Sequence, residues 1–122
     1  MSWSPISEEK VWDLIIAAEG RMSFAQQRLW NVIKVIPHKW SQEPWGNLGG
    51  GFWVVAVVGD SILWYNDIED GFNISRYVAF GKIEEYWCNQ DDLEHSVQQI
   101  LALIESGSAP YKCGPPMPVG RA

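Results

Sequence analysis

The densest group of polar side chains in the sequence is the segment Asn66-Asp-Ile-Glu-Asp-Gly-Phe-Asn73. Asp67, Glu69 and Asp70 place three carboxylates within four residues, and we expect Gly71 to adopt a left-handed turn conformation beside them. Carboxylate oxygens are the ligands that Ca²⁺ and Mg²⁺ prefer, although the spacing differs from that of an EF-hand. Three interpretations are therefore open for this segment: a solvated turn, a loop that binds a partner, and a metal site.

Other arrangements that could perform catalysis receive little support. His38 and His95 belong to no motif with Ser or Cys that would predict a catalytic triad. The run Gly49–Gly51 precedes a predicted strand instead of opening a helix, so it is not expected to hold a phosphate. Cys88 and Cys113 match no metal-ligand or redox spacing, and free thiols are a simpler interpretation than a disulfide. We therefore predict no catalytic residue, metal or cofactor, and expect that the protein is not an enzyme.

The acidic residues are unevenly distributed along the chain. Nine Lys and Arg against fifteen Asp and Glu give a formal net charge of −6. Residues 61–109 alone contain nine acidic and two basic residues, a net charge of −7. A field of this sign repels nucleic acid and speeds the encounter with a basic protein, while a surface that serves only solubility is the other interpretation. We therefore expect a basic protein partner, and a homodimer is also compatible with the sequence.

The hydropathy of the chain bears on its location. No apolar run approaches the ~20 residues that a membrane span needs, and the N-terminus lacks the pattern of a signal peptide. We therefore expect a cytoplasmic protein with no membrane partner.

Two helices are predicted before the sheet. Ser4-Pro5 or Ser7 can cap the first, and Gly20 interrupts it. Ser23 can cap the second, which we expect to continue until Pro37 stops it. Apolar residues at spacings of three and four give each helix one buried face. These residues are Val11, Leu14, Ile15, Ala18 and Met22 in the first helix, and Phe24, Leu29, Ile33 and Ile36 in the second.

An antiparallel sheet of about three strands is predicted next. Phe52–Val58 is apolar on both faces of the pleat, which indicates a central strand covered on both sides. Gly59-Asp60 is typical of a two-residue hairpin turn, after which Ser61–Tyr65 returns antiparallel to the first strand. The third strand is predicted over Ile74–Phe80, ended by Gly81.

A C-terminal helix follows the sheet. Asn89 is predicted to cap it, with Asp91 and Asp92 in its first turn and Gly107 at its end. An apolar stripe predicts its buried face: Leu93, Val97, Ile100, Leu101 and Ile104. The fold class is therefore α+β. A single domain is predicted over residues 1–107, followed by a flexible tail rich in Pro and Gly over residues 108–122.

The sequence contains eight Trp residues, which is many for 122 residues. Between Pro37 and Gly51, a segment rich in Pro and Gly, we expect Trp40 and Trp45 to fold back over the core, with an exposed recognition surface as the alternative. Four others lie in predicted helices or strands and are expected in the core: Trp12, Trp30, Trp53 and Trp64. Trp3 and Trp87 lie at the terminus and at an element boundary, where exposure is compatible with the pattern.

Three stretches of the chain carry a resemblance: Gly50–Gly59, Trp64–Asn73 and Gly81–Leu93. Together they resemble a family of small, uncharacterised proteobacterial proteins. Small acidic proteins of this kind are similar to the immunity partners of bacterial toxins delivered by contact-dependent or type VI systems. The resemblance implies a cytoplasmic binder that covers the active site of a toxin, and it transfers no catalytic residue.

The sequence therefore favours an inhibitory protein-binding module, most simply a toxin-neutralising immunity protein. We expect Asp67, Glu69 and Asp70 to contact the partner, because carboxylates steer association with a basic cleft. Four neighbouring residues are predicted as anchors or structural support in the same site: Trp64, Tyr65, Phe72 and Asn73. One alternative is a metal-dependent hydrolase that uses residues 66–73, and another is a small-ligand or assembly module with exposed Trp.

Overall fold

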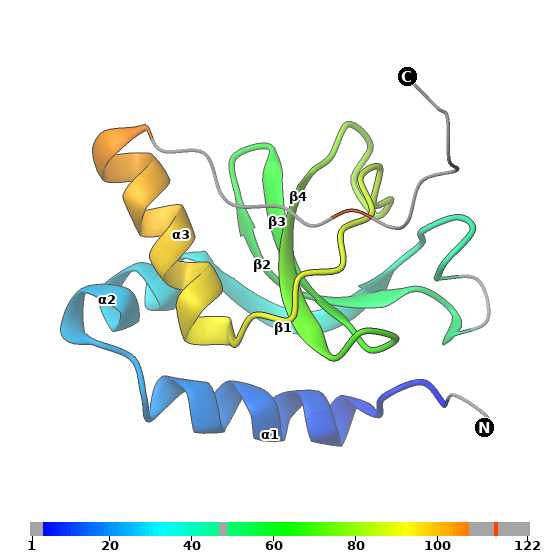
Figure 1. Cartoon of the computed structure of the whole chain (residues 1–122), viewed down its shortest axis with the longest axis horizontal. Coiled ribbons are helices and arrows are strands. Elements are labelled where there is room, and N and C mark those ends of the chain that lie inside the picture. Colours follow the sequence, from blue (N-terminus) through cyan, green and yellow to red (C-terminus); the bar gives the residue numbers. More distant parts are fainter. Residues whose placement is uncertain (1–3, 47–48, 108–113, 115–122) are drawn as a thin grey trace.

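A computed structural model describes residues 4–46, 49–107 and 114 of the chain, in which three helices pack against a four-stranded antiparallel sheet (Figure 1). The strands follow the order β1-β2-β3-β4, so each strand pairs with its neighbour in sequence. This confirms the α+β class, with four strands where about three were predicted. The elements are α1 (Glu8–Glu19), α2 (Phe24–Ile33), β1 (Lys34–Trp40), β2 (Phe52–Val58), β3 (Ser61–Asn66), β4 (Gly71–Arg76) and α3 (Leu93–Ser106).

The two N-terminal helices are separate, as predicted, because each has its own cap. The Ser7 side chain accepts a hydrogen bond from the backbone N–H of Lys10 at 3.3 Å and starts α1. Ser23 starts α2 with a capping box, in which Gln26 reaches back to the backbone N–H of Ser23 at 2.8 Å. Α local hydrogen bond therefore explains why each helix begins where it does.

The prediction that α2 continues to Pro37 was wrong, because the chain enters β1 directly after Ile33. Pro37 disfavours helical backbone at Ile36, and the β-branched Val35 and Ile36 suit a strand. The loop predicted from Pro37 to Gly51 is also wrong over its first four residues, Pro37–Trp40, because these residues belong to β1. β1 is an edge strand, where the missing N–H of a proline is tolerated.

The β2–β3 hairpin was predicted correctly and forms the centre of the sheet. A bulge between Val54 and Ala56 turns both Val55 and Ala56 toward the helices, while Val54 faces the other side. The opposite face of the sheet is covered by the coil that follows β4, which contributes Tyr77, Ile83 and Tyr86. β2 is therefore covered on both faces, as its uninterrupted apolar sequence predicted.

The third predicted strand, Ile74–Phe80, was wrong in its bounds, because β4 spans Gly71–Arg76. The turn before it is only four residues long, so pairing with β3 resumes at Gly71. Asp70 takes the left-handed conformation, with φ 55°, in place of the predicted Gly71. Val78 and Phe80 are exposed in the coil that follows the strand.

α3 begins later than predicted, with Asp92 as its N-cap residue instead of Asn89. Leu93, Val97 and Ile100 are buried as predicted, whereas Ile104 is exposed. Gly107 ends the helix in the left-handed conformation, with φ 73°, which confirms the predicted stop. The predicted tail lies outside the described residues, apart from Gly114. Cys113 lies outside them as well, and Cys88 is half-buried.

The Trp residues divide differently from the prediction. Trp30 and Trp64 are fully buried as expected, and Trp40 also folds into the core. Trp12, which was expected in the core, is 37% exposed. Trp45, which was expected to fold back over the core, is 44% exposed, although its ring stacks on that of Tyr86 at a centroid distance of 5.1 Å. Trp3 lies outside the described residues. None of the helices described is long and apolar enough to cross a membrane.

Candidate functional site

The three predicted carboxylates lie on a four-residue turn, Asp67–Asp70, which joins β3 to β4 and is called the acidic turn below. The buried Asn66 side chain shapes this turn. Its Oδ1 accepts hydrogen bonds from the backbone N–H groups of Ile68 at 3.1 Å and Glu69 at 3.2 Å. Its Nδ2 donates to the carbonyl of Trp87 at 3.0 Å, which connects the turn to the coil beyond β4. The turn is therefore held by its own side chains and by a distant segment.

The other four predicted site residues lie inside the fold. Trp64, Tyr65, Phe72 and Asn73 are all buried. The Trp64 indole N–H donates to Ser75 Oγ at 2.9 Å, and the rings of Tyr65 and Phe72 pack at a centroid distance of 4.8 Å. These four residues therefore belong to the packed interior beneath the turn, while Asp70 is exposed and Asp67 and Glu69 are half-buried.

A second acidic run, Asp91 and Asp92, lies beside the turn. The backbone N–H of Phe72 donates to the carbonyl of Asp91 at 2.9 Å, an isolated antiparallel bridge. Gln90 Nε2 donates to the carbonyl of Glu69 at 3.1 Å. The sequence did not predict this neighbourhood, because it placed Asp91 and Asp92 within a helix.

Buried amides hold the two runs together. The backbone N–H of Asn89 donates to Asn73 Oδ1 at 2.8 Å, and Asn73 Nδ2 donates back to the Asn89 carbonyl at 3.1 Å. An Asn in mid-strand, paired with a second buried Asn sixteen residues later, is the sequence signal that could have indicated this contact. We call the five carboxylates together the acidic end: Asp67, Glu69, Asp70, Asp91 and Asp92.

Asp67 connects the acidic end to the N-terminal segment. Its Oδ2 accepts a hydrogen bond from the backbone N–H of Ile6 at 2.7 Å. Burial raises the pKa of Asp67, and this hydrogen bond acts in the opposite direction. A hollow of about 530 Å³ opens between residues 4–7 and the turn, lined also by Lys10 and Asp70. The hollow has room for a side chain that would reach both carboxylates.

Tyr65 positions the second carboxylate of this hollow. Its hydroxyl donates to Asp70 Oδ1 at 3.3 Å. Burial, followed by the charge of Asp70, raises the pKa of Tyr65 to about 12. The phenol therefore stays neutral near pH 7 and keeps its proton for this hydrogen bond.

The arrangement does not favour the metal-site interpretation. Asp91 Oδ2 accepts from Asn89 Nδ2 at 3.0 Å and from Gln99 Nε2 at 3.2 Å, and Asp92 lies 3.9 Å from the His95 ring. Within the described part of the chain, no three His, Cys, Asp or Glu side chains are grouped so that they could hold a metal ion. The acidic end is thus arranged as a charged surface.

Comparisons with protein-family models, with curated proteins and with solved structures find no match to this chain.

Proposed function

We propose that this chain is an inhibitory protein-binding module whose acidic end binds a basic surface of its partner. The partner that we propose is a bacterial toxin, which the chain neutralises in the cytoplasm as an immunity protein by covering the toxin's active site. The observation that carries the proposal is the meeting of two acidic runs, twenty-two residues apart at Glu69 and Asp91, on one hydrogen-bonded surface.

Rigidity makes this surface suited to binding. The carboxylates sit on a tight turn and on a bridged segment, so little backbone entropy is lost when a partner docks. Asp67 is already partly desolvated, as its raised pKa indicates, and a cationic side chain in the hollow would offset the energetic cost of that burial. The acidic end therefore favours an Arg or Lys of the partner over a neutral group.

The charge of the surface also indicates the class of partner. Proteins that act on nucleic acid carry clustered Lys and Arg, because they must bind phosphates. An acidic surface is complementary to such a cleft, accelerates association through long-range attraction and competes with the substrate. A nuclease-type toxin thus matches the surface better than a toxin with a neutral active site.

The proposal is tested with the protein encoded next to this chain in its genome. Expression of that protein alone should arrest growth, and co-expression of this chain should restore it. Replacing Glu69, Asp70 and Asp92 together with Lys should abolish the rescue and slow association by about tenfold or more at low salt. Asp67 and Asp91 are left unchanged because their side chains accept structural hydrogen bonds, Asp67 from the backbone of Ile6 and Asp91 from the side chains of Asn89 and Gln99.

A matched control reverses three exposed acids elsewhere: Glu43, Glu84 and Glu105. This variant has the same net charge as the first, so any difference between the two reports the location of the charges. Association rates measured over a range of salt concentrations should separate them. Equal loss of rescue and equal rates in both variants would show that the acidic end is not the binding surface.

A further inference from the structure

Trp45 and Tyr86 form a partly exposed aromatic stack on the face of the sheet opposite the helices. Trp45 lies in the loop between β1 and β2, and the two rings meet at an interplanar angle of 25°. Tyr86 in turn packs against Phe52 and Trp64, which belong to the buried cluster on this face. Tyr86 thus covers one face of the indole, while 44% of Trp45 stays exposed. We call the two residues the aromatic stack.

A buried glutamine fixes the position of Trp45. Gln42 is almost fully buried, and its Oε1 accepts a hydrogen bond from the backbone N–H of Trp45 at 3.1 Å. Its Nε2 donates to the carbonyl of Glu43 at 3.0 Å. Gly46 fits so closely that a Cβ there would lie 2.9 Å from the Gln42 carbonyl oxygen. The exposed indole is therefore held in place before a partner binds, which lowers the entropic cost of binding.

The aromatic stack adjoins the acidic turn. Burial raises the pKa of Tyr86, and the carboxylates of Glu69 and Asp67 add to this effect. Hydrogen bonding by the Asn66 side chain acts on the same hydroxyl in the opposite direction. Asn66 Oδ1 also accepts from the backbone N–H of Glu69 at 3.2 Å. One side chain, Asn66, therefore joins the stack to the turn that it shapes.

Lys39 of β1 lies on the other side of the sheet from the stack. Its Nζ is 5.3 Å from the centroid of the Trp53 ring, which packs against the core on the helix side. From there its charge acts to lower the pKa of Asp67, against the larger effect of burial. Lys39 therefore offsets part of the charge of Asp67, but it does not cover the stack.

The coil that carries Tyr86 contains a second cation, which is already paired. Lys82 Nζ lies 4.0 Å from the carboxylate of Glu84. Glu69 makes no ion pair within the part of the chain that the structure describes. A cation that binds at the aromatic stack would therefore meet the unpaired charge of Glu69.

The chemistry of the stack favours a guanidinium group. A cation over the face of an aromatic ring is attracted by the ring, and Trp binds cations better than Tyr or Phe does. Arg adds a planar group that stacks on the indole and a rigid fork of N–H donors that matches a carboxylate. The ammonium of Lys is a strongly hydrated point charge, so it gains less from stacking.

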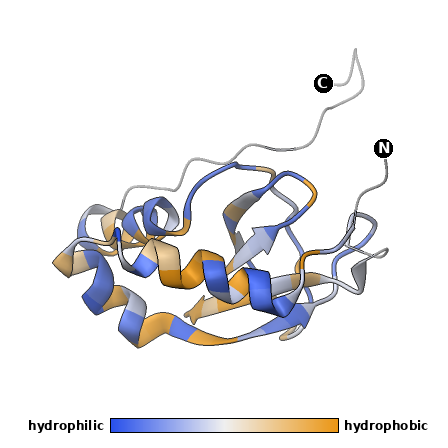
Figure 2. Ribbon diagram, turned by 90° about the horizontal axis from the view of Figure 1, so that it is seen from below, coloured by the Kyte–Doolittle hydropathy of each residue, from blue (hydrophilic) through white to orange (hydrophobic). Residues whose placement is uncertain are grey.

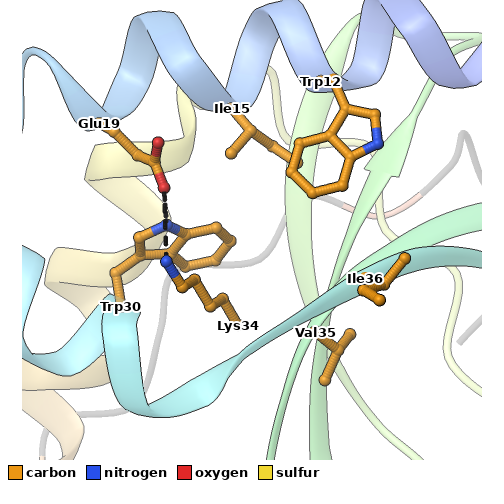
Figure 3. A pocket seen from close by; sticks show the side chains of 7 residues that line it. All are labelled: Trp12, Ile15, Glu19, Trp30, Lys34, Val35 and Ile36. Carbon is orange, nitrogen blue, oxygen red and sulfur yellow. Dashed lines mark hydrogen bonds and ion pairs between the residues drawn. The ribbon is translucent and has the colours of Figure 1, made fainter.

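Trp12 offers no comparable arrangement. It lines a hollow of about 200 Å³ between α1 and β1, where Glu19 already accepts from the Trp30 indole N–H at 2.8 Å and lies 4.0 Å from Lys34 Nζ (Figure 3). The Trp12 indole N–H donates to Glu8 at 3.1 Å. Figure 2 shows α1 hydrophilic in its first turn and mainly hydrophobic further along, where it lines the hollow. A cation at Trp12 would therefore meet carboxylates that already have partners.

We infer that the exposed face of Trp45 receives an Arg side chain of the protein partner, with the guanidinium stacked on the indole and hydrogen-bonded to the carboxylate of Glu69. The identity of that partner rests on the proposed function above. The carboxylates of the acidic end speed association through long-range attraction, whereas the stacked Arg slows dissociation once the complex has formed.

The test uses the full chain labelled with ¹⁵N and follows the Trp45 indole N–H signal. The probes are N-acetylarginine amide, its neutral isostere N-acetylcitrulline amide, N-acetyllysine amide and methyl β-glucoside. The arginine probe should cause saturable shifts and bind about threefold more tightly than the citrulline and lysine probes at low salt. Its advantage over citrulline should shrink at about 1 M salt, where the attraction of the carboxylates is screened.

Trp45→Leu should weaken the binding of the arginine probe by about threefold, because an aliphatic side chain has no ring face for the cation. The Glu69 amide signal reports binding in this variant. Phe80→Leu is the matched control, since Phe80 is exposed in the coil that also carries Tyr86 but stacks on His38. This control should bind the probe as the natural chain does.

Glu69→Gln tests the carboxylate without changing the aromatic stack. The variant keeps the shape of the side chain, so it stays informative even where Trp45→Leu disturbs the loop. It should weaken the arginine probe by about threefold and leave the citrulline probe unchanged. Glu105→Gln, at an exposed position of α3, is its control and should leave the binding of both probes unchanged.

Several results would overturn the inference. These are the absence of saturable shifts at Trp45, equal binding of the arginine and citrulline probes at low salt, or equal binding of the arginine and lysine probes. Equal effects of Trp45→Leu and Phe80→Leu would overturn it as well. Tighter binding of methyl β-glucoside than of the arginine probe would replace it with a carbohydrate-binding surface.

The complex with the toxin separates this inference from the proposed function. Trp45→Leu should raise the dissociation rate by about threefold or more and leave the association rate nearly unchanged. An unchanged dissociation rate, in a complex that the triple Lys variant disrupts, would overturn the inference and leave the proposed function standing. Binding of the arginine probe at Trp45 in a chain that neutralises no toxin would support the stacked contact and overturn the proposed function.

Discussion

The carboxylate of Asp67 accepts a hydrogen bond from the backbone N–H of Ile6 at 2.7 Å, across sixty-one positions of sequence. The carbonyl of the same residue, Ile6, accepts from the Trp53 indole N–H at 3.1 Å. The segment before α1 is therefore held on both sides, by the acidic turn and by β2. These two bonds connect the N-terminal segment, the acidic turn and the central strand into one unit.

Asp67→Ala should release this segment. The variant leaves the Ile6 N–H without its acceptor, which should lower the free energy of unfolding by about 1–2 kcal/mol. Urea unfolding measures the loss, and faster hydrogen exchange at the Ile6 amide locates it. Asp67→Asn is the control, because its Oδ1 can still accept the bond. Equal exchange at Ile6 in both variants would contradict the role given to this bond.

The pH dependence of Asp67→Asn follows from the raised pKa of Asp67, which burial causes. Because the folded-state pKa lies above the unfolded value, the stabilising contribution is complete below the ordinary pKa of about 4 and is lost as pH rises through the raised value. Asn carries no charge at any of these pH values. The variant should therefore gain stability relative to the natural chain between pH 3 and pH 7, and a constant difference would contradict the prediction.

The features that were predictable from the sequence are those with local causes. Ser7 and Ser23 cap their helices through residues three positions away, and Gly107 ends α3 through its own backbone conformation. β2 was predictable because both of its faces are apolar. The start of α3 was not predictable, because Asn89 is hydrogen-bonded to Asn73 of β4 and does not cap the helix. No periodicity of the sequence indicates this contact.

The candidate site was predictable only in part, for the same reason. The three acids of the turn are close in sequence, whereas Asp91 and Asp92 are brought beside them by the backbone hydrogen bond from Phe72 to Asp91 and by the bond from the Gln90 side chain to the Glu69 carbonyl. The hollow between α1 and β1, lined by Trp12, Ile15 and Ile36, was hidden from the sequence because the chain up to Pro37 was expected to be helix instead of strand. A pocket between two elements cannot be inferred when one of the elements is not recognised.

Glu94 should show the opposite pH dependence to Asp67. Arg21 donates to both of its carboxylate oxygens, at 2.6 and 3.1 Å, and these hydrogen bonds lower the pKa of Glu94. Its stabilising contribution is therefore present above the ordinary pKa of about 4.5 and is lost as pH falls through the lowered value. Glu94→Gln should destabilise the chain at pH 7 and lose most of that effect near pH 2. Thermal unfolding across this range measures the trend.

The control for this prediction is Glu105→Gln on the same helix. Glu105 is exposed, so its replacement should change stability little at any pH. If Glu94→Gln and Glu105→Gln showed the same pH dependence, the ion pair with Arg21 would have no part in joining α3 to the N-terminal helices.

Gly71→Ala should separate the two acidic runs. A Cβ at this position would lie 2.1 Å from the carbonyl oxygen of Asn89 and 2.3 Å from Gln90 Cα, both backbone atoms. The backbone of the two segments must move apart, which should lower the free energy of unfolding by about 3 kcal/mol. The variant should also bind more weakly to any partner that contacts both the turn and Asp92.

Gly20→Ala is the control, since its nearest contact is 3.5 Å away and its φ of −67° suits any residue. It should leave stability unchanged or raise it by about 0.5 kcal/mol, because it restricts the unfolded chain. Urea unfolding compares the two variants, and equal stability would show that the close approach of Gly71 to Asn89 is not what holds the acidic end together.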